Sequence, residues 1–231
     1  MSLGEIQKRI ELACQKSGRH PSNVRLLAVS KRQSEEHIRQ VSQQGQSDFG
    51  ENYVQELIQK MAFFSKDSLH WHLIGHLQRN KVKMISGRCF RIHSVDSLRL
   101  AQELSRHARE KNIVEKVLLQ INLAEEASKE GFSQESLATA WAEISQLPNL
   151  AIHGFMTMPP LQNEPEENRI YFRQLRILLD HFRQLTHSII HPLNELSMGT
   201  SHDFEIAIEE GASWIRVGTL IFGERPPLPN H

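Results

Sequence analysis

Leu26-Leu27-Ala28-Val29-Ser30-Lys31 is the stretch that decides the fold of this chain. Its apolar residues predict a buried parallel strand, and a helical pattern begins after Ser34, so Lys31 lies in the loop where the strand ends. A lysine partly removed from water at that edge favours the neutral amine, which is a nucleophile toward aldehydes. Most loop lysines are solvated surface residues, so the rest of the chain has to decide between these two interpretations.

Outward from this strand, short apolar runs alternate with amphipathic segments. The apolar runs predict strands at residues 26–29, 48–50, 70–74, 89–93, 116–122, 151–155, 195–196 and 214–217. Helical patterns lie between them at residues 34–44, 53–64, 78–85, 97–111, 134–146, 166–186 and 202–210. A capping box formed by Ser2 and Glu5 starts a further helix, which runs to Lys16 ahead of the first strand.

This alternation predicts one closed barrel. Parallel strands need helical crossovers, and eight such strands close into a packed tube. We therefore expect residues 1–225 to form a single (β/α)8 TIM barrel with an extra N-terminal helix, and an open, doubly wound α/β sheet is the alternative. Residues 226–231 are rich in proline and predict a disordered tail, for which a polyproline recognition segment is the alternative.

The composition excludes several classes of function. The 231 residues include 27 basic and 27 acidic side chains, so no net charge attracts nucleic acid or an anionic membrane. Residues 1–9 lack the apolar core of a secretory signal, and no apolar run approaches the length of a membrane span. Two cysteines are too few for a disulfide framework. We expect a cytoplasmic protein without nucleic-acid or membrane partners.

Polar residues and glycines gather where the predicted strands end. Lys31 follows the first strand, residues 50–52 the second and residues 75–76 the third, while residues 197–201 and 218–219 follow the last two. Active sites of barrels lie at this end of the strands, and their phosphate sites commonly use the seventh and eighth loops. Glycine amides together with the hydroxyls of Ser201 and Thr219 therefore predict a phosphate site.

Arg216 lies within the last predicted strand, where a buried charge needs a partner. A salt bridge to Glu51 or Glu195 is one interpretation, and a hydrogen bond to a bound heterocycle is the other. Lysine, phosphate site and arginine together fit pyridoxal 5'-phosphate, held as a Schiff base on Lys31 with Arg216 at the ring nitrogen. Arginine stays protonated, so it leaves that nitrogen unprotonated and weakens the ring as an electron sink.

Five motifs occur in one order between residues 5 and 224. They are Ala28-Val29-Ser30-Lys31, Phe49-Gly50-Glu51-Asn52-Tyr53-Val54-Gln55-Glu56, Trp71-His72-Leu73-Ile74-Gly75-His76-Leu77-Gln78, Leu196-Ser197-Met198-Gly199, and Ile215-Arg216-Val217-Gly218-Thr219 with Phe222-Gly223. Together they resemble the pyridoxal phosphate homeostasis proteins, a family once called proline synthetase co-transcribed homologues.

The resemblance implies a barrel similar to the N-terminal domain of bacterial alanine racemase, which is fold type III. It also implies a protein without established catalysis that holds, buffers and delivers pyridoxal phosphate, so that vitamin B6, amino-acid and keto-acid pools stay balanced. The cofactor-binding residues that it implies are Lys31, Asn52, His76, Met198, Ser201, Arg216, Gly218 and Thr219. Family members often carry a methionine at the position of Thr200 and a serine at that of Arg79. Thr200 adds a hydroxyl beside the phosphate, and Arg79 adds either an anion contact or a solvated helix residue.

Two enzymatic alternatives use the same residues. An amino-acid racemase needs a second base opposite the lysine, which in alanine racemases is a tyrosine working with a C-terminal β-domain from the partner subunit. Tyr53 and Tyr171 lie in predicted helices, and we expect no such domain, so we expect at most weak racemase activity. A Schiff-base aldolase also uses a barrel lysine and a phosphate site, and it would be colourless.

A metal site is a further alternative. His70 and His72 face the same way on a strand, and His76 is near them in the sequence. No carboxylate is visibly placed to complete the ligand set, so we expect no metal. Without the racemase β-domain we expect a monomer, whose protein partners are apo pyridoxal phosphate enzymes that receive the cofactor.

Overall fold

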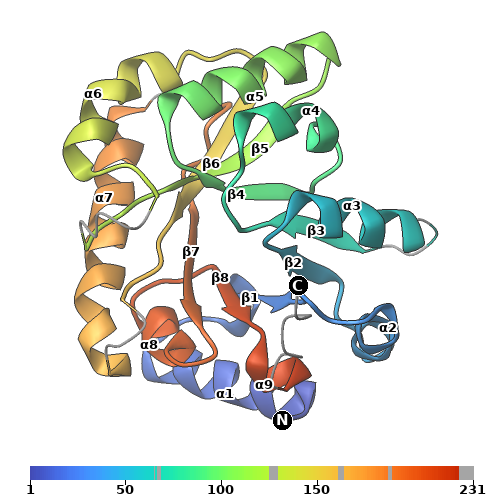
Figure 1. Ribbon diagram of the computed structural model, residues 1–231. Coiled ribbons are helices and arrows are strands. Elements are labelled where there is room, and N and C mark those ends of the chain that lie inside the picture. The colour runs from blue at the N-terminus through green and yellow to red at the C-terminus, as the bar shows by residue number, and fades with distance from the viewer. Residues whose placement is uncertain (65, 67–68, 125–129, 161–163, 187–188, 224–231) are drawn as a thin grey trace.

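Eight parallel strands form a closed barrel with helices packed around its outside (Figure 1). The computed structural model describes residues 1–231 apart from 65, 67–68, 125–129, 161–163, 187–188 and 224–231. The predicted tail at residues 226–231 therefore lies outside the described residues. The strands are β1 (Arg25–Val29), β2 (Asp48–Glu51), β3 (His70–Leu73), β4 (Arg91–Val95), β5 (Glu115–Gln120), β6 (Leu150–Met156), β7 (Glu195–Thr200) and β8 (Trp214–Val217).

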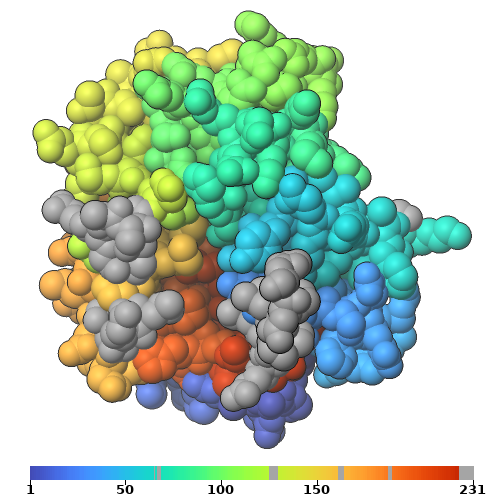
Figure 2. All heavy atoms as spheres, viewed as in Figure 1, coloured from blue at the N-terminus to red at the C-terminus, as the bar shows by residue number. Residues whose placement is uncertain are grey.

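Helices connect these strands and cover the barrel. They are α1 (Leu3–Lys16), α2 (Glu35–Gln43), α3 (Val54–Phe63), α4 (Val82–Ile85), α5 (Leu98–Glu110), α6 (Gln134–Ile144), α7 (Arg169–Leu185), α8 (Phe204–Glu209) and α9 (Thr219–Phe222). Short 3-10 turns are η1 (Pro21–Asn23), η2 (Arg79–Lys81) and η3 (Pro165–Asn168). Figure 2 shows, in the same view as Figure 1, that successive segments of the chain follow one another around the molecule. Among the described residues, no helix has both the length and the apolar character needed to span a membrane.

The barrel closes where β1 pairs with β8. Residues 25–28 lie opposite residues 214–217 in parallel register. An open sheet would leave both strands as unpaired edges, so this pairing confirms the predicted (β/α)8 barrel. The extra N-terminal helix α1 packs against α8. Its capping box also forms as predicted, because the Ser2 hydroxyl accepts from the Glu5 amide and the Glu5 carboxylate accepts from the Ser2 amide.

Side chains alternate between the interior and the outside of the barrel, and this decides which residues reach the mouth. Leu27, Ile74 and Trp214 pack together in a small cluster, separate from the larger hydrophobic core that includes the buried helix faces. The inward-facing side chains of β1 include Leu27, and the same alternation continues to Lys31, two residues beyond the end of the strand. The inward-facing side chains of β8 include Trp214 and Arg216. Both sets of side chains run to the C-terminal mouth, where the sequence predicts the site.

The sequence predicts some boundaries incorrectly. It predicts a loop after residue 196, but β7 continues to Thr200. Gly199 lies inside the strand with a φ of 87°, and a Cβ there would lie 2.5 Å from the Ala207 side chain. The helix predicted at 78–85 divides into η2 and α4, and β4 begins at Arg91 rather than at residue 89.

Candidate functional site

A cavity of about 330 Å³ opens at the C-terminal mouth of the barrel. Residues at or after the ends of β1, β2, β3, β6, β7 and β8 contribute to its wall. The residues that line it are Val29, Lys31, Asn52, Ile74, Met158, Thr200, Ser201, His202, Arg216, Gly218 and Thr219. The structure therefore brings together most of the residues that the sequence predicts to bind a cofactor, including the lysine and the arginine.

Lys31 lies in a turn whose backbone is fixed on both sides. Before it, the Lys60 ammonium donates to the Ser30 carbonyl oxygen at 2.7 Å. After it, the Arg32 amide donates to Glu56 Oε1 at 2.5 Å, and Arg32 has a left-handed φ of 62°. A non-glycine residue in that region is strained by about 1–3 kcal/mol. The contact with Glu56 therefore holds a conformation that the backbone does not favour by itself.

Lys60 bridges two carboxyl groups beneath this turn. Its side chain is buried, and Nζ lies 2.7 Å from Glu51 Oε1 and 2.6 Å from Glu56 Oε1. The Ser30 hydroxyl also donates to Glu51 Oε1, at 2.6 Å. Burial raises the pKa of Glu51 to about 7, although Lys60 and Ser30 lower it. Glu51 Oε2 has no hydrogen-bond partner within the described part of the chain. A group that exchanges its proton near neutral pH thus lies directly beneath the Lys31 turn.

Arg216 is buried in β8 and is held by uncharged groups. One terminal nitrogen donates to Ser197 Oγ at 2.9 Å, and the other donates to the Thr157 carbonyl oxygen at 2.9 Å. Burial lowers the pKa of Arg216 to about 10, so the guanidinium remains charged at neutral pH. A charged, fixed donor group therefore forms part of the cavity wall.

The two carboxylates that the sequence offers as partners of Arg216 pair with other cations. Glu51 pairs with Lys60, and Glu195 lies 2.8 Å from an Arg91 nitrogen. Glu195 also accepts from the indole N–H of Trp214 at 2.9 Å. The structure therefore contradicts the interpretation of Arg216 as part of an internal salt bridge to Glu51 or Glu195.

A series of hydrogen bonds crosses the barrel interior from β2 to Arg216. Asp48 Oδ1 lies 3.1 Å from His72 Nε2, and His72 Nδ1 lies 2.9 Å from His93 Nε2. His93 Nδ1 in turn lies 2.9 Å from Ser197 Oγ, the oxygen that Arg216 contacts. Burial lowers the pKa of both histidines, and that of His93 most strongly, so both are neutral near pH 7.

Hydroxyl groups line the part of the cavity where the sequence predicts a phosphate. The Gly218 amide donates to Ser201 Oγ at 3.1 Å, so this amide already has an acceptor, and Ser201 can still donate its own proton. Thr219 begins α9, where the first amides of a helix lack intrahelical acceptors. The Thr200 hydroxyl donates to Asp203 Oδ1 at 3.0 Å, so it fixes the loop between β7 and α8.

Two of the predicted cofactor residues do not line this cavity. Met198 is fully buried in β7 and belongs to the larger hydrophobic core. His76 is exposed and lines two other cavities, one of which also includes Asn52. Asn52 joins that cavity to the one that contains Lys31, and its Oδ1 has no partner among the described residues. A direct role of Met198 or His76 toward a cofactor stays a prediction.

Sequence reasoning missed the apolar wall of the cavity and the groups that hold Arg216. Val29, Ile74 and Met158 form the apolar wall. Strand alternation identifies Val29, because it lies two residues before Lys31 on the same side of the strand. The bond from Arg216 to Thr157 joins residues 59 apart in the chain, and no local sequence signal reports such a contact.

The histidines at residues 70, 72 and 76 pair with carboxylates at two different ends of β3. His70 Nδ1 and His72 Nε2 both lie near Asp48 Oδ1, at 3.2 and 3.1 Å, so they face the same way as predicted. His76 instead lies 3.0 Å from Asp96 Oδ2, beyond the other end of the strand. The sequence did not show this carboxylate as a partner, because it follows a different strand.

Comparison with known proteins gives full-length matches. The chain matches the family model described as alanine racemase, N-terminal domain, over residues 1–226. It is 43% identical over 223 residues to the pyridoxal phosphate homeostasis protein of Aquifex aeolicus (strain VF5), covering 96% of each chain. It is 40% identical over 224 residues to the protein of the same name from Pseudomonas aeruginosa, covering 97% of this chain and 94% of that relative. The structure of PipY from Synechococcus elongatus PCC7942 with PLP bound is 40% identical, with a TM-score of 0.82 over 94% of this chain and 100% of that chain.

Proposed function

This chain belongs to the pyridoxal phosphate homeostasis protein family, and we propose that it binds pyridoxal 5'-phosphate at the barrel mouth and buffers it there. One observation carries the proposal: Lys31, Arg216 and the hydroxyls of Ser201 and Thr219 line the same cavity. Its volume of about 330 Å³ lies within the usual range of small-molecule sites.

Each part of the cofactor has a matching group in this cavity. Pyridoxal phosphate supplies an electrophilic aldehyde on an electron-withdrawing ring. The Lys31 amine would condense with the aldehyde, with the loss of one water molecule. Arg216, fixed through Ser197, would donate a hydrogen bond to the ring nitrogen, and Ser201 with Thr219 would donate to the phosphate. Asn52, His76, Met198 and Gly218 complete the set of residues that we propose around the cofactor.

The same residues support a binding protein rather than an enzyme. A guanidinium cannot pass its proton to the ring nitrogen, so the ring is a weak electron sink. A racemase also needs a second base opposite the lysine. Neither tyrosine is among the residues that line the cavity: Tyr53 is 58% exposed next to α3, and Tyr171 lies in α7. We propose that any racemase activity is a weak side reaction.

Buffering requires that the cofactor can leave again. Lys31 is partly exposed at the cavity opening, which supports exchange with solvent and transfer to apo pyridoxal phosphate enzymes. We propose that the protein is a monomer. We also propose a cytoplasmic location, which suits the free cysteines Cys14 and Cys89.

Visible absorption of the purified protein with added pyridoxal phosphate tests the proposal. We expect a yellow band that borohydride bleaches, and peptide mass mapping should place the reduced adduct on Lys31. Lys31→Ala should lose the band, whereas Lys81→Ala, which removes another lysine near the mouth, should keep it. A protein that stays colourless would contradict the cofactor assignment and favour the aldolase alternative.

Transfer has its own test. The protein loaded with pyridoxal phosphate should reactivate an apo pyridoxal phosphate enzyme faster than Lys31→Ala does at the same total cofactor concentration. Equal rates would show that free cofactor is the donor in both mixtures. Formation of D-amino acids at the turnover of ordinary racemases would contradict the assignment as a binding protein.

A further inference from the structure

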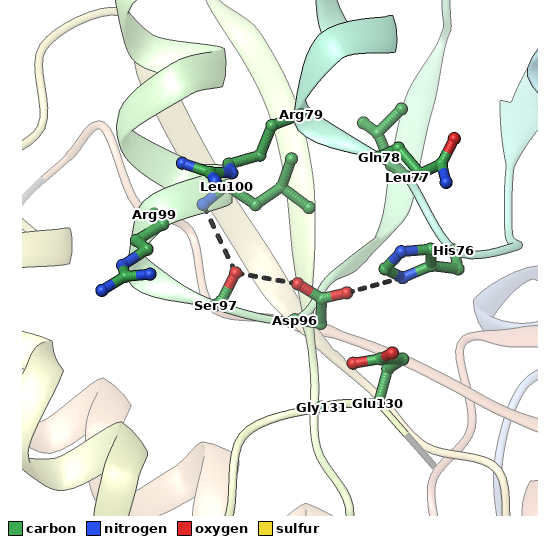
Figure 3. Close-up of a pocket in the computed structure, with 10 residues that line it drawn as sticks. All are labelled: His76, Leu77, Gln78, Arg79, Asp96, Ser97, Arg99, Leu100, Glu130 and Gly131. Carbon is green, nitrogen blue, oxygen red and sulfur yellow. Dashed lines mark hydrogen bonds and ion pairs between the residues drawn. The ribbon is translucent and has the colours of Figure 1, made fainter. Parts of the chain in front are cut away.

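A second cavity, of about 420 Å³, lies at the same end of the barrel (Figure 3). Three side chains of metal-ligating type meet at its wall: His76, Asp96 and Glu130. Their ligand atoms all lie within 4.8 Å of one another, although the residues follow three different strands, β3, β4 and β5. None of the three lines the cavity that contains Lys31, and only His76 is among the residues proposed around the cofactor, so the proposed cofactor site does not account for Asp96 and Glu130.

Buried or local contacts fix the first two ligand residues. The Ser94 hydroxyl, inside β4, donates to the Gly75 carbonyl oxygen at 2.6 Å, directly before His76. The Asp96 side chain is 8% exposed, and its Oδ1 accepts from the Ser97 hydroxyl at 2.9 Å. Oδ2 then faces the ring of His76, as Figure 3 shows. This histidine and this carboxylate are therefore oriented toward one point before any ligand arrives.

Glu130 reaches the same point from a segment that pairs with the end of β5. The Gln120 side chain donates to the Glu130 carbonyl oxygen at 2.8 Å, and the Phe132 amide donates to the Gln120 carbonyl oxygen at 2.8 Å. The backbone on both sides of the glutamate is thus anchored, while its exposed side chain can rotate. Within the described part of the chain, the Glu130 carboxylate has no ion-pair or hydrogen-bond partner, which leaves its oxygens available to a cation.

The distance between the first two ligand atoms fits a metal ion. His76 Nδ1 and Asp96 Oδ2 are 3.0 Å apart. With bonds of about 2.1 Å, ligand atoms at that separation subtend an angle of about 90° at the ion, and a tetrahedral angle needs about 3.4 Å. The rotation of Glu130 supplies the third bond. His76 would bind the ion through an Nδ1 that carries no proton, with the ring proton on Nε2.

The opposite wall of the cavity is cationic. Arg79 and Arg99 line it, and neither forms an ion pair with Asp96 or Glu130 in the described structure. The two arginines balance the two carboxylates, so a bound divalent ion gives the cavity a net positive charge. An anionic co-ligand such as phosphate or carboxylate, placed between the ion and the guanidinium groups, neutralises that charge.

We propose that His76, Asp96 and Glu130 bind a divalent transition-metal ion, whose remaining coordination positions face Arg79 and Arg99 and accept an anionic co-ligand. One imidazole nitrogen with two carboxylate oxygens suits Zn²⁺, Co²⁺ or Mn²⁺, whereas Mg²⁺ prefers oxygen and water ligands. Three protein ligands leave positions open, as in metal sites that bind a further group rather than purely structural ones.

Titration of the full chain with Co²⁺ tests this site, by calorimetry and by the visible d–d bands of the bound ion. We expect one equivalent to bind at micromolar concentration, and Mg²⁺ not to compete at equal concentration. His76→Gln, Asp96→Asn and Glu130→Gln should each weaken binding at least tenfold. His70→Gln is the matched control, because it removes an exposed histidine of β3 that also pairs with an aspartate, Asp48 of β2, and it should bind Co²⁺ like the wild type.

Three results would contradict the proposed metal site. No saturable binding below millimolar Co²⁺, wild-type affinity in all three ligand variants, or loss of binding in His70→Gln would overturn the proposal. Inorganic phosphate should tighten Co²⁺ binding in the wild type and not in Arg99→Gln. An equal effect of phosphate on both proteins would contradict the proposed anionic co-ligand. The circular dichroism of Asp96→Asn and its yellow band on Lys31 should match those of the wild type, so loss of metal binding is distinguishable from unfolding.

Discussion

Lys60→Met removes the ammonium that contacts the Ser30 carbonyl, Glu51 and Glu56 at 2.6 to 2.7 Å beneath the Lys31 turn. Methionine fills a similar volume, so the change removes charge and hydrogen bonds and leaves little cavity. Glu51 is fully buried and would remain with only the Ser30 hydroxyl as a donor. The expected result is a loss of stability whose size depends on pH.

The pH dependence follows from the protonation of Glu51. Burial already raises its pKa to about 7, and loss of Lys60 raises it further. Below pH 6 the carboxyl is protonated in both folded proteins, so the variant loses only the Lys60 hydrogen bonds, about 1–2 kcal/mol. Above pH 7 it is ionised in the folded wild type and in both unfolded chains, but it stays protonated in the folded variant. The free energy of unfolding of the variant then falls by about 1.4 kcal/mol per pH unit relative to the wild type.

Urea unfolding at pH 6, 7, 8 and 9, followed by tryptophan fluorescence, measures this difference. We expect about 3 kcal/mol at pH 8, which approaches the cost of about 3–5 kcal/mol for an unpaired buried charge. The double variant Lys60→Met/Glu51→Gln should lose the dependence on pH above 7, because it has no buried carboxyl to titrate. A difference that stays constant from pH 6 to 9, or a slope that persists in the double variant, would refute the reasoning.

Two further changes probe the mouth, and a third, in α1, is the control for the first. Gly75→Ala should lower the free energy of unfolding by more than about 3 kcal/mol, because a Cβ there would lie 2.2 Å from the Asn52 carbonyl oxygen. Gly4→Ala, at a helical position of α1 with open space around it, should raise it by up to about 1 kcal/mol, and thermal unfolding compares the two. Arg216→Lys should weaken pyridoxal phosphate binding at least tenfold in an absorbance titration, because an ammonium does not reproduce the fixed fork of donors. An unchanged affinity would remove the proposed contact with the ring nitrogen.

The placement of Lys31 and Arg216 in one cavity was predictable, although they lie at opposite ends of the chain. Apolar runs marked the strands, and parallel strands in a closed barrel bring all their C-terminal ends to one mouth. The period of two along each strand then directs Lys31 to the same side as Leu27. Local pattern and barrel geometry together are sufficient for residues that lie on a strand or directly after it.

The same reasoning does not fix the direction of a side chain that lies in a loop or that depends on tertiary contacts. His76 lies beyond β3, so strand alternation no longer fixes its direction, and it pairs with Asp96 and does not line the cavity that contains Lys31. Met198 belongs to the loop predicted at residues 197–201, whereas β7 extends to Thr200. Gly199 is a left-handed residue inside the strand, close to α8, and this extension of β7 buries Met198 in the core.

The polar interior of the barrel explains why the donors of Arg216 point as they do. Burial alone would raise the pKa of Asp48, but the hydrogen bond with His72 contributes most to lowering it overall, so Asp48 is an acceptor. His72 must then donate from Nε2, and its Nδ1 accepts from Nε2 of the neutral His93. His93 Nδ1 accepts the Ser197 proton, and the Ser197 oxygen is left to accept from Arg216. One carboxylate in β2 thereby sets the direction of every hydrogen bond up to the arginine in the cavity wall.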